Sequence, residues 1–208
     1  MNGLSKYYKQ IMVALGCALL MCFLLAIDLG SKALAEWYYE AYGLNQPSYF
    51  LGIVKLTYTR NYDVAYGIIS KFFDYNSPEY QVAMEIVRYG TVLLAVLIAV
   101  MFFTIFRKNL PVRVCLAVVE AGALGNIIDR FCLGYVRDFI DVQPIGFNIC
   151  NIADFFITGG VVAVVICILF IGKDAVFPLT KKWREEAKQE DRERDVRNGH
   201  AGQEEGHD

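Results

Sequence analysis

The sequence contains few of the residues with which proteins bind metal ions or cross-link their chains. Only two of the 208 residues are histidines, and both lie in the polar C-terminal part. The six cysteines form no CxxC pair, and most of them lie inside apolar runs. We therefore expect neither a metal site nor a disulfide framework, and we interpret the cysteines as small apolar packing residues.

Motifs that identify other enzyme classes are also missing. The sequence has no GxSxG, HExxH or GxxxxGK[ST] pattern, and it lacks the GxGD pattern found in one class of intramembrane proteases. These absences argue against a serine-hydrolase elbow, a zinc-peptidase helix and a phosphate-binding loop. No basic stripe with interleaved aromatic residues occurs, so we expect no nucleic-acid partner.

The chain is instead dominated by long apolar runs. Hydrophobic residues make up 56% of the sequence, the formal net charge is only −2, and the charged residues cluster between the runs. Soluble domains are nearer half apolar and interleave their charges with apolar residues. The length suits one domain, and the pattern indicates an integral membrane protein.

Four segments could each span a bilayer, which requires roughly 20 mostly apolar residues. The third is the weakest, because it contains Glu120, Asn126 and several glycines. The first could instead be a signal peptide cleaved after Ala35, but its length and the intervening Asp28 and Lys32 favour an uncleaved membrane helix. The four segments cover about 11–27, 89–106, 114–128 and 152–171.

The orientation of the spans follows from the lysines and arginines, which favour the cytoplasmic side. The short loop between the second and third spans holds Arg107, Lys108 and Arg113, and further cations precede the first span and follow the fourth. Both termini are therefore predicted to be cytoplasmic. Residues 28–83 and 129–151 are predicted to lie outside.

Two β-prone runs in these outer segments, 53–59 and 135–140, predict a small sheet at the outer leaflet. The fold class that we expect is thus membrane all-α with a small β part. Residues 1–180 would form the membrane domain. Residues 181–208, which alternate acidic and basic side chains, would form a charged cytoplasmic tail, disordered beyond a frayed helix.

Carboxylates near apolar spans are costly and therefore require an explanation. Asp154 begins the fourth span, and it could simply be a first-turn acid that favours the helix by roughly 0.3–1 kcal/mol. Asp138 could be a solvated loop residue. If the two carboxylates meet, however, they cannot both ionise cheaply, so they would share a proton and could activate a water without a metal.

Five motifs in order give the chain a resemblance to the lipoprotein signal peptidases, the type II signal peptidases of bacteria. The resemblance covers about residues 10–172. The motifs are Asp28…Lys32, Arg60-Asn61…Gly67, Gly122-Ala123-Leu124-Gly125-Asn126-Ile127-Ile128-Asp129-Arg130, Gly134-Tyr135-Val136-Arg137-Asp138-Phe139-Ile140-Asp141 and Asn151-Ile152-Ala153-Asp154.

The resemblance implies an aspartic endopeptidase of the bacterial inner membrane, with four transmembrane helices, an extracytoplasmic β-cradle and a mobile loop over the site. Its substrates would be prolipoproteins, cut just before a diacylglyceryl-modified cysteine at the outer face, and membrane lipid would be its other partner. We expect a monomer and no cofactor. The catalytic residues would be Asp138 and Asp154, with Asp141 outside the mechanism. The residues that would line or support the pocket are Asp28, Lys32, Asn61, Gly67, Asn126, Asp129, Arg130 and Asn151.

Physical roles follow for some of these residues. Asn61 and Asn126 could offer amides to the substrate backbone, and Arg130 could bind a carbonyl or carboxylate. A polar network that stabilises the third span is the alternative for Asn126, Asp129 and Arg130. Gly122 and Gly125 are interpreted as sites of close helix packing.

The chain departs from the family pattern in two places. Asp63 stands where the outer loop usually has a glycine, which adds a charge and removes backbone freedom. Cys150 stands where an aromatic residue is usual, although Asn151 keeps the expected spacing to Asp154.

Two other classes of function agree less well with the sequence. A proton-coupled carrier could use an acid inside a span, such as Glu120, but the sequence shows no inverted repeat, and its acids gather at one face rather than at the midplane. A structural assembly subunit would leave the five ordered polar motifs without an explanation.

Overall fold

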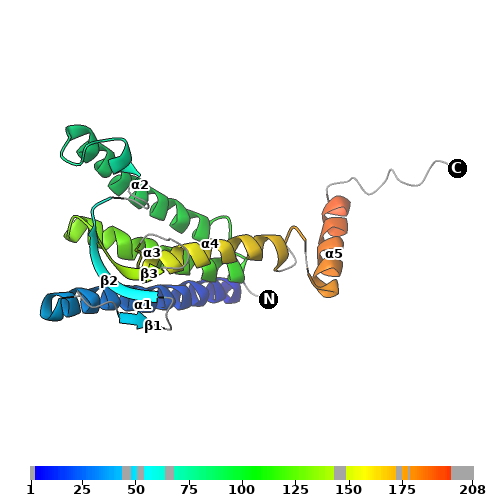
Figure 1. Ribbon diagram of the computed structural model, residues 1–208. Coiled ribbons are helices and arrows are strands. Elements are labelled where there is room, and N and C mark those ends of the chain that lie inside the picture. Colours follow the sequence, from blue (N-terminus) through cyan, green and yellow to red (C-terminus); the bar gives the residue numbers. More distant parts are fainter. Residues whose placement is uncertain are drawn as a thin grey trace. The chain divides into compact units, whose positions relative to one another are not determined.

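The computed structural model describes residues 3–43, 48–50, 54–63, 68–142, 149–171, 175–177 and 179–197 (Figure 1). Its helices are α1 (Gly3–Tyr42), the 3-10 helix η2 (Ile69–Lys71), α2 (Pro78–Phe103), α3 (Leu110–Cys132), α4 (Ile152–Phe170) and α5 (Lys181–Arg197). Its strands are β1 (Ser48–Phe50), β2 (Val54–Asn61) and β3 (Val136–Val142).

Four of these helices, α1 to α4, are long and apolar enough to cross a membrane, which confirms the predicted fold class. Two of them extend well beyond the apolar segments predicted from the sequence, because polar residues continue or cap them. The helix α1 runs on through Asp28 and Lys32 to Tyr42. The helix α2 begins at Pro78, where the side chain of Ser77 accepts a hydrogen bond from the Tyr80 backbone N–H.

The strands form one antiparallel sheet in the order β1-β2-β3. Both β-prone runs predicted from the sequence are strands, and β1 is an additional, short edge strand. A register irregularity between Leu56 and Thr59 precedes the point where Thr59 pairs with Asp138. Beyond β3, a bridge between Ile140 and Cys150 brings the residues before α4 back to the sheet. This return places Asn151 beside the strand that carries Asp138.

The helix α3 is the centre of the membrane part, because it contacts both α1 and α2 and approaches α4 closely. Two glycines allow these approaches. A Cβ at Gly122 would lie 2.5 Å from the Ala153 carbonyl oxygen at the start of α4, and a Cβ at Gly125 would collide with the carboxylate of Asp28 on α1. These contacts agree with the prediction that both glycines allow close helix packing.

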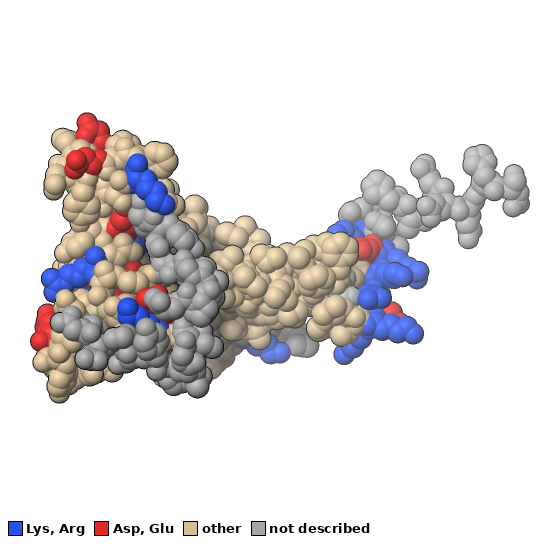
Figure 2. All heavy atoms as spheres, in the orientation of Figure 1, with Lys and Arg blue, Asp and Glu red and all other residues tan. Residues whose placement is uncertain are grey.

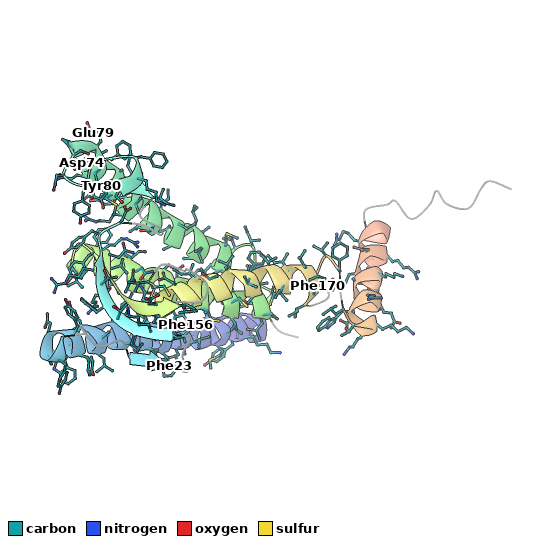
Figure 3. All side chains as sticks on the ribbon, viewed as in Figure 1. Phe23, Asp74, Glu79, Tyr80, Phe156 and Phe170 are labelled. Atoms are coloured by element: carbon teal, nitrogen blue, oxygen red, sulfur yellow. The ribbon has the colours of Figure 1, made fainter. Side chains whose placement is uncertain are left out.

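Apolar side chains cover the outside of the helices. Phe23, which is labelled in Figure 3, points away from α1 and is 64% exposed. Figure 2 shows acidic and basic atoms gathered around β2, β3 and the start of α2, beside a helical surface formed mostly by uncharged residues. Polar residues are instead found at the centre, where Asp28, Lys32, Asp129 and Asn151 are fully buried. This distribution suits a protein whose helices are surrounded by lipid.

The chain divides into two compact units, Met1–Val161 and Val162–Asp208. The first contains all the candidate site residues. In the second, α5 carries ion pairs between neighbouring turns, such as Lys182 with Glu186 at 3.9 Å. Residues 198–208 lie outside the described part, so the domain boundary at residue 181 and the disorder of the tail remain predictions.

The Gly125→Ala variant should be less stable than the wild type, because the new methyl group would occupy the space of the Asp28 carboxylate. Overpacking of this kind costs about 1–3 kcal/mol. Thermal unfolding in detergent would show a lowered Tm. Gly30→Ala is the matched control, since nothing lies within 4 Å of a Cβ there. An equal Tm for both variants would contradict the proposed contact.

Candidate active site

A buried ion pair joins two helices at the base of the site. The Lys32 ammonium donates to Asp28 Oδ2 at 2.7 Å and to Asn126 Oδ1 at 2.8 Å, and its nitrogen lies 3.7 Å from Asp129 Oδ2. The side chains of Lys32, Asp28 and Asp129 are all fully buried. A charge without a partner would be very costly there, so these contacts fix α1 against α3.

The same carboxylate of Asp28 also holds the start of α4. The Ala153 backbone N–H donates to Asp28 Oδ1 at 2.9 Å. A helix begins with N–H groups that have no partner within the helix, and an acid near them is favoured by the helix dipole. Asp28 therefore links three helices, because its second oxygen accepts from Lys32 and Gly125 leaves room for it on α3.

Asn151 and Asp154 cap α4 reciprocally. The Asp154 backbone N–H donates to Asn151 Oδ1 at 3.2 Å, and the Asn151 backbone N–H donates to Asp154 Oδ2 at 3.0 Å. This arrangement is that of a capping box. Asp154 is thus a first-turn acid, and its other oxygen, Oδ1, faces Asn126, whose Nδ2 donates to it at 3.0 Å.

Asp138 is held by two amides. Asn61 Nδ2 donates to Asp138 Oδ2 at 2.8 Å, and Asn151 Nδ2 donates to Asp138 Oδ1 at 2.6 Å. Burial is the main cause that raises the pKa of Asp138 to about 6, with the negative charge of Asp154 adding to it. The hydrogen bonds from Asn61 and Asn151 act in the opposite direction, because they stabilise the ionised carboxylate.

An unbroken chain of side-chain hydrogen bonds runs from one aspartate to the other. It passes from Asp138 to Asn151, whose Nδ2 also donates to Asn126 Oδ1 at 3.2 Å, and from Asn126 to Asp154. In this structure the amides of Asn61 and Asn126 each donate to a carboxylate, and their contact with a substrate backbone stays a prediction. The two carboxylates thus belong to one hydrogen-bond network, and a carboxyl group with a raised pKa, such as that of Asp138, is suited to acid or base chemistry.

A second ionic cluster supports Asp129 from the side of the sheet. Arg137 on β3 donates to both oxygens of Asp129, from Nη2 at 2.7 Å and from Nε at 3.2 Å, in a bidentate pair. Its Nη1 donates to Glu36 Oε2 at 3.3 Å. Glu36 Oε1 accepts from the hydroxyls of Tyr58 at 2.8 Å and Tyr135 at 3.1 Å. This cluster ties the sheet to α1 and α3.

Glu36 was missed by the sequence analysis. Its position eight residues after Asp28 on a continuous helix could have suggested it, since residues at this spacing lie on the same helical face. That inference required α1 to continue beyond the apolar run, which the hydropathy pattern alone does not indicate.

Two further residues, Arg130 and Gly67, were also predicted to line or support the pocket. Arg130 is half-buried, and its charge interacts with those of Asp154 and Asp138, but it forms no hydrogen bond or ion pair with another described residue. Gly67 lies outside the described residues. Within the described ranges, no three His, Cys, Asp or Glu side chains converge to hold a metal ion.

Asp63, the residue that departs from the family pattern, binds the 3-10 helix η2. Its carboxylate accepts hydrogen bonds from the backbone N–H groups of Ile69, at 3.3 Å, and Ser70, at 2.9 Å. Its own backbone N–H donates to Asn61 Oδ1 at 3.0 Å. Because Asn61 donates to Asp138, the helix η2 is connected to the candidate site through Asp63 and Asn61.

The outer end of α2 is joined to the same region by aromatic side chains. Tyr80, labelled in Figure 3 at the start of α2, donates its hydroxyl to the Tyr62 carbonyl oxygen at 3.0 Å. The ring of Tyr62 in turn lies 5.2 Å from that of Tyr135. These contacts hold the chain immediately after Asn61 against the sheet.

Known proteins provide the comparison for this geometry. The sequence model of the signal peptidase (SPase) II family matches residues 20–170. A lipoprotein signal peptidase of Caldicellulosiruptor bescii is 32% identical over 161 residues, which are 75% of this chain and 91% of that protein. A lipoprotein signal peptidase of Streptococcus agalactiae is 31% identical, over 70% of this chain and 86% of that protein. A solved bacterial membrane enzyme is 28% identical with a TM-score of 0.56, over 74% of this chain and 87% of that chain.

The Asp63→Ala variant should loosen η2, because the hydrogen bonds from the Ile69 and Ser70 backbone N–H groups to the carboxylate are lost. We expect faster proteolytic cleavage at η2, within residues 68–71, and a Tm close to that of the wild type. Asp63→Asn keeps one acceptor oxygen, so its cleavage rate should lie between those of the wild type and Asp63→Ala. Asp74→Ala is the control, since Asp74 caps only an exposed turn through the Asn76 N–H. Equal cleavage rates for Asp63→Ala and Asp74→Ala would refute this role.

Proposed function

The chain belongs to the signal peptidase II family, and we propose that Asp138 and Asp154 form the catalytic pair of this membrane-bound peptidase. Removal of signal peptides from prolipoproteins is the activity that its family and relatives support. One observation carries the assignment of the pair. The two carboxylates are joined by hydrogen bonds through Asn151 and Asn126, while Asp141 lies three positions farther along β3, where a strand presents the opposite face.

The proposed reaction is attack of a water on the scissile carbonyl. The ionised carboxylate of the pair takes a proton from the water, and the protonated carboxyl donates a hydrogen bond to the carbonyl oxygen. The proton then passes to the leaving amine as the tetrahedral intermediate collapses. The raised pKa of Asp138 supports a proton on this pair, although the two titration steps belong to the pair rather than to either residue.

The surrounding polar groups would then position the reacting atoms. Asn61, Asn151 and Asn126 orient the carboxylates, and this preorganisation saves the cost of ordering them during the reaction. Arg130 is the cation near the pair with no hydrogen bond or ion pair among the described residues, so it is suited to bind a backbone carbonyl of the substrate. Lys32, by contrast, is fully buried and engaged, and its role is to position Asn126.

The substrate we propose is a prolipoprotein with a diacylglyceryl-modified cysteine, cut immediately before that cysteine. Its acyl chains would remain in the bilayer beside the helices, and each buried CH₂ contributes roughly 0.8 kcal/mol to binding. We further propose that a monomer lies in the bacterial inner membrane with both termini cytoplasmic. The sheet and the aspartate pair would then face the outer side, which is supported by the cations of the α2–α3 loop.

Asp138→Asn and Asp154→Asn should each abolish processing while the protein remains folded, because neither amide can serve as the proton acceptor. Asp141→Asn is the matched control and should retain most of the activity. The measurement is conversion of a purified diacylglyceryl-modified prolipoprotein in detergent, with Tm determined for each variant. Cleavage at the wild-type rate by Asp138→Asn or Asp154→Asn would remove that residue from the mechanism.

The pH dependence of processing offers a second test. If the pair works with one shared proton, activity falls as pH rises and that proton is lost. The hydrogen bond from Asn61 lowers the pKa of Asp138, so Asn61→Ala should raise this pKa further. The alkaline limb of the normalised rate profile should therefore move to higher pH, whatever the loss in absolute rate. A limb that is unmoved, or that moves to lower pH, would contradict the shared proton on Asp138.

A further inference from the structure

A basic pocket lies far from the aspartate pair, between the first turns of α1, the end of α2 and the start of α3. Its volume is about 370 Å³. Its cationic lining consists of Arg107, Lys108 and Arg113, and no acidic residue contributes to it among the described residues. Arg113 precedes Asn126 by 13 residues on α3, which corresponds to about 20 Å along the helix axis.

Arg113 is the buried element of this pocket. Its side chain is only 3% exposed. It donates to Gln10 Oε1 at 3.0 Å and to the Arg107 carbonyl oxygen at 3.4 Å, and it lies 4.3 Å from the centre of the Phe102 ring. Its Nε has no hydrogen-bond partner, and no carboxylate of the described residues pairs with it. A buried cation with no counter-ion is costly, so the pocket is suited to receive an anion.

An apolar groove continues the basic pocket into the membrane part. It has a volume of about 200 Å³, and it shares Ala14 and Phe103 with the basic pocket. On α1 the basic pocket is lined by residues 7, 10, 11 and 14, and the groove by residues 14, 17, 18 and 21. Residues at this spacing lie on one face of α1, so the two cavities follow each other along that face.

We propose that the basic pocket and the apolar groove together bind one anionic phospholipid. Its phosphate would lie on Arg113, Arg107 and Lys108, and one acyl chain would occupy the groove. Basic pockets between membrane helices are known to recognise anionic headgroups in this way. Under the orientation proposed above, this lipid belongs to the cytoplasmic leaflet, opposite to the leaflet that faces the aspartate pair.

Two features of the cavities favour a lipid over other occupants. The n-region of a signal peptide is positively charged, and three cations without an acid would repel it. Glu120 lines the groove, but it follows Arg113 by seven residues, about 10 Å along α3, so it would lie beside the acyl chain rather than at the headgroup. The groove lining is otherwise apolar, apart from the thiol of Cys17, which suits a hydrocarbon chain.

Thermal unfolding of the delipidated full-length protein in detergent tests this proposal without any substrate, so its result is independent of the peptidase assignment. Three additives are compared: phosphatidylglycerol, phosphatidylcholine with the same acyl chains, and glycerophosphoglycerol, which is the headgroup without chains. We expect a saturable rise in Tm with phosphatidylglycerol only. An equal rise with phosphatidylcholine would show a chain site without headgroup selection. An equal rise with glycerophosphoglycerol would show an anion site without a chain. Either result would overturn the proposal.

Variants of exposed residues keep the test independent of the buried Arg113. The double variant Arg107→Gln/Lys108→Gln should bind phosphatidylglycerol more weakly by about fivefold for each cation removed. Lys181→Gln/Lys182→Gln removes the same charge from α5 and should bind like the wild type. Ala18→Phe, which fills the groove, should also weaken binding. Equal losses in the two double variants, or unchanged binding in Ala18→Phe, would contradict a specific lipid site.

Discussion

The arrangement of α1, α3 and α4 depends on the buried ammonium group of Lys32. Lys32 is completely enclosed, and leaving such a charge without its partners would cost about 3–5 kcal/mol. The groups that surround it therefore have to converge: Asp28 from its own helix, and Asp129 and Asn126 from α3. In a bilayer the hydrophobic effect gives helices little reason to choose one neighbour over another, so packing and polar contacts decide the arrangement. Because the Lys32 ammonium group needs these partners, it positions the residues that support the proposed site.

The contacts that stabilise the fold and those that would prepare the chemistry are largely the same. Asp154 is a capping residue of α4 and one member of the proposed pair, so the simple structural interpretation and the catalytic one do not compete. Asn151 likewise caps α4 with its oxygen while its amide nitrogen donates to Asp138. Such double use holds the carboxylates within a fixed hydrogen-bond network, and Arg137, bound to Asp129 and Glu36, fixes the strand that carries Asp138.

Much of this arrangement could be predicted from the sequence, and the remainder has a physical reason. Hydropathy located the four spans, whereas the choice of Asp138 over Asp141, which came from the family motifs, stays a prediction. Hydropathy could not locate the end of α1, because that helix continues through charged residues that find partners on other elements. For the same reason Glu36 was missed, and the hydrogen bonds from the amides of Asn61 and Asn126 to the two aspartates were not predicted. The partners of a buried polar side chain depend on which elements meet, and a periodic pattern along one segment does not contain that information.

The central claim is that Asp138 and Asp154 act as one unit on one water. A double-mutant cycle on processing of a purified diacylglyceryl-modified prolipoprotein tests it most directly, with single-turnover rates for Asp138→Asn, Asp154→Asn and the double variant. Residues that act as a unit show strongly non-additive effects. The account predicts that the double variant is no slower than the slower single variant. Losses that multiply in the double variant would mean that the two carboxylates contribute independently, and would contradict the account.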